Sequence, residues 1–107
     1  MAFRIEITDL ALRDAEDYVE FLREVRRAPE AAARWFRGLV RAIYSLEESP
    51  ERCPLIPESD EFSFEIRHLI FHSHRIVYRV FPEPQVVVIY RVYHGSRQAL
   101  EVTKLTN

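Results

Sequence analysis

Alternating apolar and polar residues open the chain and predict a strand over residues 3–8, where Phe3, Ile5 and Ile7 are separated by polar side chains. A period of two is typical of a strand with one buried face. From Ala11 the apolar spacing changes to three and four residues, which predicts an amphipathic helix ending at residues 26–28. Thr8 or Asp9 is the expected N-cap. The apolar positions of this helix are Ala11, Ala15, Tyr18, Leu22 and Val25.

A second helix is predicted to begin at Pro29 and to stop before Pro50. Proline suits the first position of a helix because its missing N–H has no intrahelical acceptor there. The two helices are joined by a short connection and therefore predict a helical hairpin. The apolar stripe of the second helix is Ala32, Phe36, Leu39, Ile43 and Leu46.

Three runs rich in β-branched and aromatic residues follow, at 65–71, 74–81 and 85–93, with short turn segments between them. Such runs predict consecutive hairpins. The expected fold is α+β in the order β-α-α-β-β-β, with the helical hairpin on one face of a small, mainly antiparallel sheet. Residues 49–64 hold three prolines and form a long loop that we expect to be mobile or involved in binding.

Period-two alternation assigns the side chains of the last two strands to faces. It places Arg75 and Arg79 opposite Ile76, Tyr78 and Val80. It groups the last strand into two sets, which are Val86, Val88, Tyr90, Val92 and His94 on one side and Val87, Ile89, Arg91 and Tyr93 on the other. With Arg67, this predicts an arginine-lined face opposite the helices and at the strand ends.

Charge is distributed unevenly along the chain. The formal net charge is −2, but residues 1–65 carry 9 Arg against 15 acidic residues and residues 66–107 carry 6 basic against 2 acidic residues. All four histidines lie in the second part. Guanidinium groups bind carboxylates and phosphates bidentately, so this half suits an acidic peptide or a nucleic acid. The alternative is that these arginines are merely solvated.

Composition excludes several classes. We expect the 107 residues to form a single domain, with residues 98–107 as a loosely ordered tail. We expect no secretory signal, because the start of the chain has no apolar stretch, and no apolar run is long enough to cross a bilayer. One cysteine fits a reducing cytoplasm, and two glycines leave no nucleotide-binding loop. The histidines at 68, 72 and 74 lack a fourth ligand at a suitable spacing, so we expect neither metal nor cofactor.

Four segments, read together, resemble RelE/ParE-type toxins of bacterial type II toxin–antitoxin, or plasmid-stabilisation, modules. They are TDLALRDAEDYVEFL, the proline-started helix ending LEESP, HRIVYRV, and VVVIYRVYHGSR. With the strand that precedes them, the resemblance covers roughly residues 4–98. The resemblance implies the same β-α-α-β-β-β fold. It also implies a cytoplasmic growth inhibitor that is neutralised in a hetero-oligomer with a small antitoxin and does not engage a membrane.

Two activities divide this family. RelE- and YoeB-like members cleave mRNA on the ribosome, and ParE-like members inhibit DNA gyrase. By resemblance to the nuclease pattern, Arg75 corresponds to a phosphate-contacting arginine, Arg97 to a second catalytic arginine and His94 to an acid/base histidine.

The nuclease pattern is incomplete in this chain. Gly95 replaces the tyrosine that follows the histidine, Thr103 stands where RelE-like members have a tyrosine, and the only lysine is Lys104. We therefore favour the ParE-like, gyrase-binding branch. The alternatives are a ribosome-dependent mRNA endoribonuclease and a non-toxic member that only forms complexes.

The same residues suggest how the antitoxin binds. Its acidic, extended segment is expected to lie across the basic face formed by Arg67, Arg75, Arg79, Arg91 and Arg97, or to add to a sheet edge.

Overall fold

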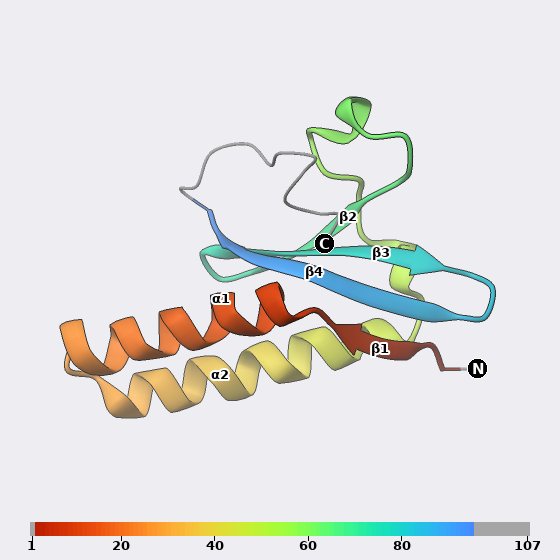
Figure 1. The fold of residues 1–107 in the computed structure, drawn as a ribbon. Helices are drawn as coiled ribbons and strands as arrows, with labels where there is room; N and C mark the ends of the chain where they lie inside the picture. The colour runs from red at the N-terminus through yellow and green to blue at the C-terminus, as the bar shows by residue number, and fades with distance from the viewer. Residues whose placement is uncertain (1, 96–107) are drawn as a thin grey trace.

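The computed structural model describes residues 2–95, so Arg97 and the expected tail at 98–107 lie outside the described residues. Two long helices lie against one face of a four-stranded sheet (Figure 1). The chain order β-α-α-β-β-β agrees with the predicted α+β class. The elements are β1 (Arg4–Ile7), α1 (Asp9–Glu20), α2 (Pro29–Tyr44), β2 (Arg67–Phe71), β3 (His74–Phe81) and β4 (Val86–His94).

The strands are arranged in the order β1-β4-β3-β2. Strand β1 pairs in parallel with the first half of β4, from Val86 to Ile89, and the other pairings are antiparallel. Because β1 ends at Ile7, it covers only that first half of β4. Helix α1 continues directly from β1 and runs beside the remainder of β4 (Figure 1).

Thr8 fixes the start of α1 against β4. Its Oγ1 accepts a hydrogen bond from the Ala11 N–H at 3.0 Å and donates to the Tyr90 carbonyl at 2.9 Å. The first contact is the expected N-cap, which satisfies a helix N–H that has no intrahelical acceptor. At its other end, α1 passes into a π-helical turn, Phe21–Val25, before Pro29 opens α2. The helix predicted to end at residues 26–28 therefore changes from α-helical to π-helical geometry at Phe21.

A β-bulge in β4 changes the predicted side-chain pattern. Adjacent residues Val77 and Tyr78 of β3 pair with Arg91 and Ile89, so Tyr90 is an extra residue. An extra residue resets the alternation of the strand beyond it. Val92 consequently joins Ile89 on the helix face, and the expected grouping of Val92 and His94 with residues 86, 88 and 90 is wrong. The helix-face core is Ala11, Ala15, Leu39, Ile43, Leu46, Cys53, Ile76, Tyr78, Val87, Ile89 and Val92.

The loop at residues 49–64 covers the second face of the sheet. Ile56 packs with Ile66, Val77 and Tyr93, and the rings of the loop's two phenylalanines lie against this cluster. Two backbone hydrogen bonds, from the Ile56 N–H to Ile66 at 2.9 Å and from His68 to Pro54 at 3.2 Å, hold the loop to β2. The loop thus supplies a second apolar core. No helix within residues 2–95 combines the length and apolar character needed to cross a membrane.

Candidate functional site

His94 lies at the end of β4 on the helix face, paired across the strands with His74. The two imidazole rings are 5.0 Å apart between centroids and meet edge-to-face. Tyr18 of α1 packs against both rings, at 4.5 Å from His74 and 6.2 Å from His94. Because β3 and β4 are directly paired here, the fold joins two histidines that lie 20 positions apart and that sequence reasoning did not connect.

Both histidines line a cleft of about 450 Å³ between α1 and the end of β4. His74 forms its inner wall, with 4% of its surface exposed. The cleft therefore brings acidic side chains together with arginine and histidine side chains around one opening. It is lined by Asp14, Asp17, Tyr18, Phe21, Arg26, His74, Val92 and His94.

Arg75 lies on the opposite face of the sheet from His94. It follows the inward-facing His74 directly in β3, and successive strand residues point to opposite faces. Its guanidinium forms a two-point ion pair with Glu58 of the 49–64 loop, at 3.3 and 3.1 Å, and both side chains are at most 15% exposed. Arg75 and His94 are therefore not brought together, and Arg97 lies outside the described residues.

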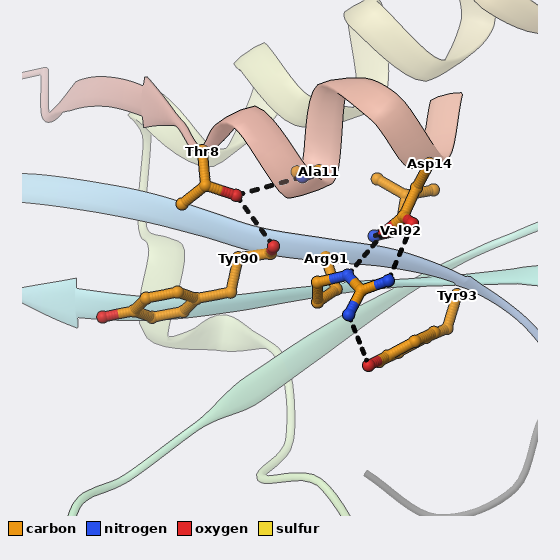
Figure 2. Close-up of polar contacts among 7 residues, drawn as sticks. All are labelled: Thr8, Ala11, Asp14, Tyr90, Arg91, Val92 and Tyr93. Atoms are coloured by element: carbon orange, nitrogen blue, oxygen red, sulfur yellow. Dashed lines mark hydrogen bonds and ion pairs between the residues drawn. The ribbon is translucent and has the colours of Figure 1, made fainter. Parts of the chain in front are cut away.

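Arg91 is held by α1 (Figure 2). Its Nε and Nη2 atoms donate to the two carboxylate oxygens of Asp14 at 2.8 and 2.9 Å, and Nη1 donates to the Tyr93 hydroxyl at 2.9 Å. The hydrogen bond with Asp14 raises the pKa of Arg91. The same carboxylate accepts the Val92 N–H at 2.9 Å. This arrangement satisfies a strand donor where β1 has ended.

The remaining arginines of the expected basic face are also engaged. Arg67 donates to the Cys53 carbonyl at 2.7 Å and stands opposite Tyr78, on the helix side of the sheet. The Arg79 guanidinium lies 4.0 Å from the centroid of the Phe64 ring. The structure therefore differs from the predicted open face, because Arg67, Arg75, Arg79 and Arg91 contact the chain's own loop, helix or rings.

The histidines at 68, 72 and 74 are not grouped at one site. His68 is on β2 near Arg75 and Glu58, and its pKa is lowered by burial and then by the Arg75 charge, with Glu58 opposing. His72 occupies a left-handed turn position with φ of 53°. Within residues 2–95, no three His, Cys, Asp or Glu side chains are grouped as metal ligands would be.

A groove between α1 and α2, on the side away from the sheet, was missed by sequence reasoning. Phe36, Val40 and Tyr44 recur every four residues along α2 and are 38%, 38% and 45% exposed. Leu12 of α1 is 45% exposed. The stripe was detectable from its i, i+4, i+8 spacing, but Phe36 was assigned to the core. The groove holds about 860 Å³ and is lined by Glu16, Val19, Glu20, Arg23, Glu24, Pro29, Ala32, Ala33 and Phe36.

The fold is similar to that of solved structures of toxin–antitoxin systems. The chain matches a structure of the chromosomal ParDE system from P. aeruginosa with a TM-score of 0.71 and 18% identity, covering 87% of this chain and 96% of the other. It matches the RelBE2 toxin–antitoxin complex from Mycobacterium tuberculosis with a TM-score of 0.60 and 22% identity, over 91% and 95% of the two chains. An archaeal RelE–RelB complex from Pyrococcus horikoshii OT3 gives a TM-score of 0.53 and 16% identity, over 92% and 100%.

The family model described as the ParE toxin of the type II toxin–antitoxin system parDE matches residues 5–99. The chain belongs to the ParE toxin family and is a toxin of the type II toxin–antitoxin class. No curated protein matches it.

Proposed function

We propose that this toxin inhibits growth by binding DNA gyrase and that it does not cleave mRNA. The separation of Arg75 from His94 carries this proposal. A nuclease needs its phosphate-binding arginine and its acid/base groups gathered around one scissile phosphate, each within hydrogen-bond reach of it. Here Arg75 is bound to Glu58 under the loop, whereas His94 opens into the cleft on the helix side. Membership of the ParE toxin family supports the same branch.

One observation favours the alternative, a ribosome-dependent endoribonuclease. His74 stands 5.0 Å from His94, so two imidazoles are available where sequence reasoning found only one acid/base group. A general base and a leaving-group acid are two groups, and this pair supplies two imidazoles. Of the two arginines expected for the nuclease, Arg75 is the one within residues 2–95, and it is paired with Glu58 on the other face of the sheet.

The discriminating experiment expresses the toxin without its antitoxin. Purified toxin is added to a gyrase supercoiling assay, and mRNA 5′ ends are mapped in cells expressing the wild type or His94→Ala. We expect inhibited supercoiling, unaltered mRNA ends and toxicity retained in His94→Ala. In-frame mRNA cuts that disappear in His94→Ala would overturn the gyrase proposal. The absence of any toxicity would support the non-toxic alternative instead.

We propose that the antitoxin places an amphipathic helix in the groove between α1 and α2. The exposed stripe of Phe36, Val40 and Tyr44 has the spacing that one helix presents to another. Three glutamates and one arginine line the α1 side, so basic residues beside the apolar stripe of the partner helix are favoured.

This docking is tested by changing the groove in complexes co-purified with the antitoxin. Phe36→Glu places a charge at the stripe residue that lines the groove and is expected to weaken the complex at least tenfold, which corresponds to about 1.4 kcal/mol. Val25→Glu is the matched control because Val25 is 66% exposed and does not line the groove. Equal affinities of the two variants would contradict this site.

A further inference from the structure

A ridge of three arginines on α2 remains open to an external anion. The arginine ridge consists of Arg34, Arg37 and Arg41, which are all exposed. Within residues 2–95, none of these guanidinium groups is hydrogen-bonded or ion-paired. The described arginines after residue 65 are instead engaged by the chain's own loop, helix or rings. The open positive charge therefore lies in the part of the chain whose formal charge is negative.

Helix geometry aligns the ridge on the outer side of α2. Each residue turns about 100° around an α-helix, so Arg34 and Arg41 differ by about 20° and Arg37 lies within about 60° of both. Leu39 is buried in the helix-face core and lies about 160° from Arg37. The ridge therefore points away from the core. At a rise of about 1.5 Å per residue, it is about 10.5 Å long.

The surroundings of the ridge favour a polyanion over a folded protein surface. No apolar side chain lies between the three arginines along this side of α2, and Glu30 is the one acidic residue of the helix. The centre of the exposed apolar stripe that borders the groove lies about 90° around the helix from the ridge. Protein interfaces usually have an apolar centre, whereas binding to a phosphate backbone requires mainly positive charge.

The length of the ridge matches a nucleic-acid backbone. Each strand of duplex DNA carries one phosphate per about 3.4 Å of helix axis, so the ridge passes about three successive phosphates. A guanidinium group binds phosphate oxygens through two parallel hydrogen bonds. Three such contacts displace condensed counterions, and log K is therefore expected to fall with log salt concentration at a slope of about −2.7.

We propose that the arginine ridge of α2 binds the phosphate backbone of duplex DNA without reading its sequence. The choice of duplex DNA among polyanions rests on the proposed gyrase role, because gyrase holds a DNA duplex and a toxin bound to gyrase has that duplex within reach. The ridge and the groove occupy different sides of α2. Antitoxin binding in the groove is therefore a separate contact.

Fluorescence anisotropy of a short labelled duplex, titrated with the purified toxin at several salt concentrations, tests the ridge. We expect Arg37→Gln to weaken binding about threefold to tenfold and to reduce the salt slope by about one. Arg13→Gln is the matched control, since it removes the same charge from an exposed residue of α1. Carboxylates stand four residues before Arg13 and three and four residues after it, so DNA is disfavoured there. Equal effects of the two variants would overturn the inference.

Glu30→Gln provides a variant in which binding is expected to increase. It removes the one negative charge of α2 and is expected to tighten DNA binding about twofold to fivefold, a gain that misfolding does not produce. Unchanged or weaker binding would contradict the ridge. Single-stranded RNA or anionic phospholipid vesicles bound more tightly than the duplex would overturn the assignment to DNA. Because this assay uses the toxin alone, a failure to bind DNA overturns the inference, whereas the gyrase proposal is decided separately by the supercoiling assay.

Discussion

The Asp14 carboxylate on α1 takes the place of a neighbouring strand for Val92 on β4. It accepts the Val92 N–H at 2.9 Å and pairs with Arg91 through both of its oxygens (Figure 2). A backbone donor left without a partner at this edge would be costly. One helix side chain therefore completes the sheet where β1 ends.

Asp14→Ala is expected to lower the free energy of unfolding by about 3 kcal/mol, since it leaves a largely buried Arg91 without its counter-charge. The side chains of this pair are only 12% and 15% exposed. Urea denaturation measures the effect. The control is Glu6→Ala, which removes the exposed Arg4–Glu6 pair and is expected to cost about 0.5 kcal/mol or less. Similar losses in the two variants would contradict the assigned role.

Tyr78→Phe tests the contact between the sheet core and the start of the long loop. The fully buried hydroxyl donates to the Pro50 carbonyl at 2.6 Å. Removing the hydroxyl is expected to lower the free energy of unfolding by about 1–2 kcal/mol, because the Pro50 carbonyl loses the hydrogen bond from Tyr78. Thermal unfolding provides the measurement, and Tyr44→Phe on the exposed face of α2 is the control.

Burial raises the pKa of Tyr78 well above its usual value near 10. The folded protein therefore retains the phenolic proton more strongly than the unfolded chain. The corresponding stability is fully present below pH 10 and is lost progressively as the pH rises above 10. We expect the wild type to lose stability in this range with a steeper pH dependence than Tyr78→Phe, as measured by denaturation at pH 8 and pH 11. Equal pH dependence would contradict the raised pKa.

His68 gives a pH dependence in the acidic range. Burial and the Arg75 charge lower its pKa below 6.5, so the folded state favours the neutral imidazole. The unfolded chain binds the proton more readily, and stability therefore falls as the pH drops below 6.5. Denaturation at pH 7.5 and pH 5 is expected to show a smaller loss in His68→Asn than in the wild type. An NMR titration of the His68 ring with a midpoint at or above 6.5 would count against this assignment.

Glu58→Gln is expected to loosen the 49–64 loop by removing the charge that Arg75 contacts. The two side chains are 15% and 12% exposed, and breaking such a pair is expected to cost about 1–3 kcal/mol. Limited proteolysis within the loop reports the effect, with Asp60→Asn in the same loop as the control. An unchanged cleavage rate in Glu58→Gln would show that the apolar contacts of the loop suffice to hold it.

The sequence was sufficient to predict the order and approximate limits of the elements, because each depends on local periodicity. It did not reveal the bulge at Tyr90, since that extra residue is defined only by the pairing of Val77 and Tyr78 across the sheet. The predicted open basic face differs from the structure for a related reason. Arg91 and Asp14 lie 77 positions apart, so their pairing has no local signature.

The contact of Thr8 with Tyr90 joins positions 82 residues apart, and it accompanies the parallel pairing of β1 with β4. Among residues 2–95, β4 is the one strand that pairs with β1, so the N-terminal strand joins the sheet only when β4 is in place. Long-range pairing of this kind slows folding, because loop-closure entropy is spent before the contact forms. It also makes the folding of the toxin cooperative from end to end. A fragment ending before Val86 would leave β1 and α1 without β4, their principal neighbour. If the two fragments are produced separately, the β1–β4 pairing gives them a surface through which to reassociate.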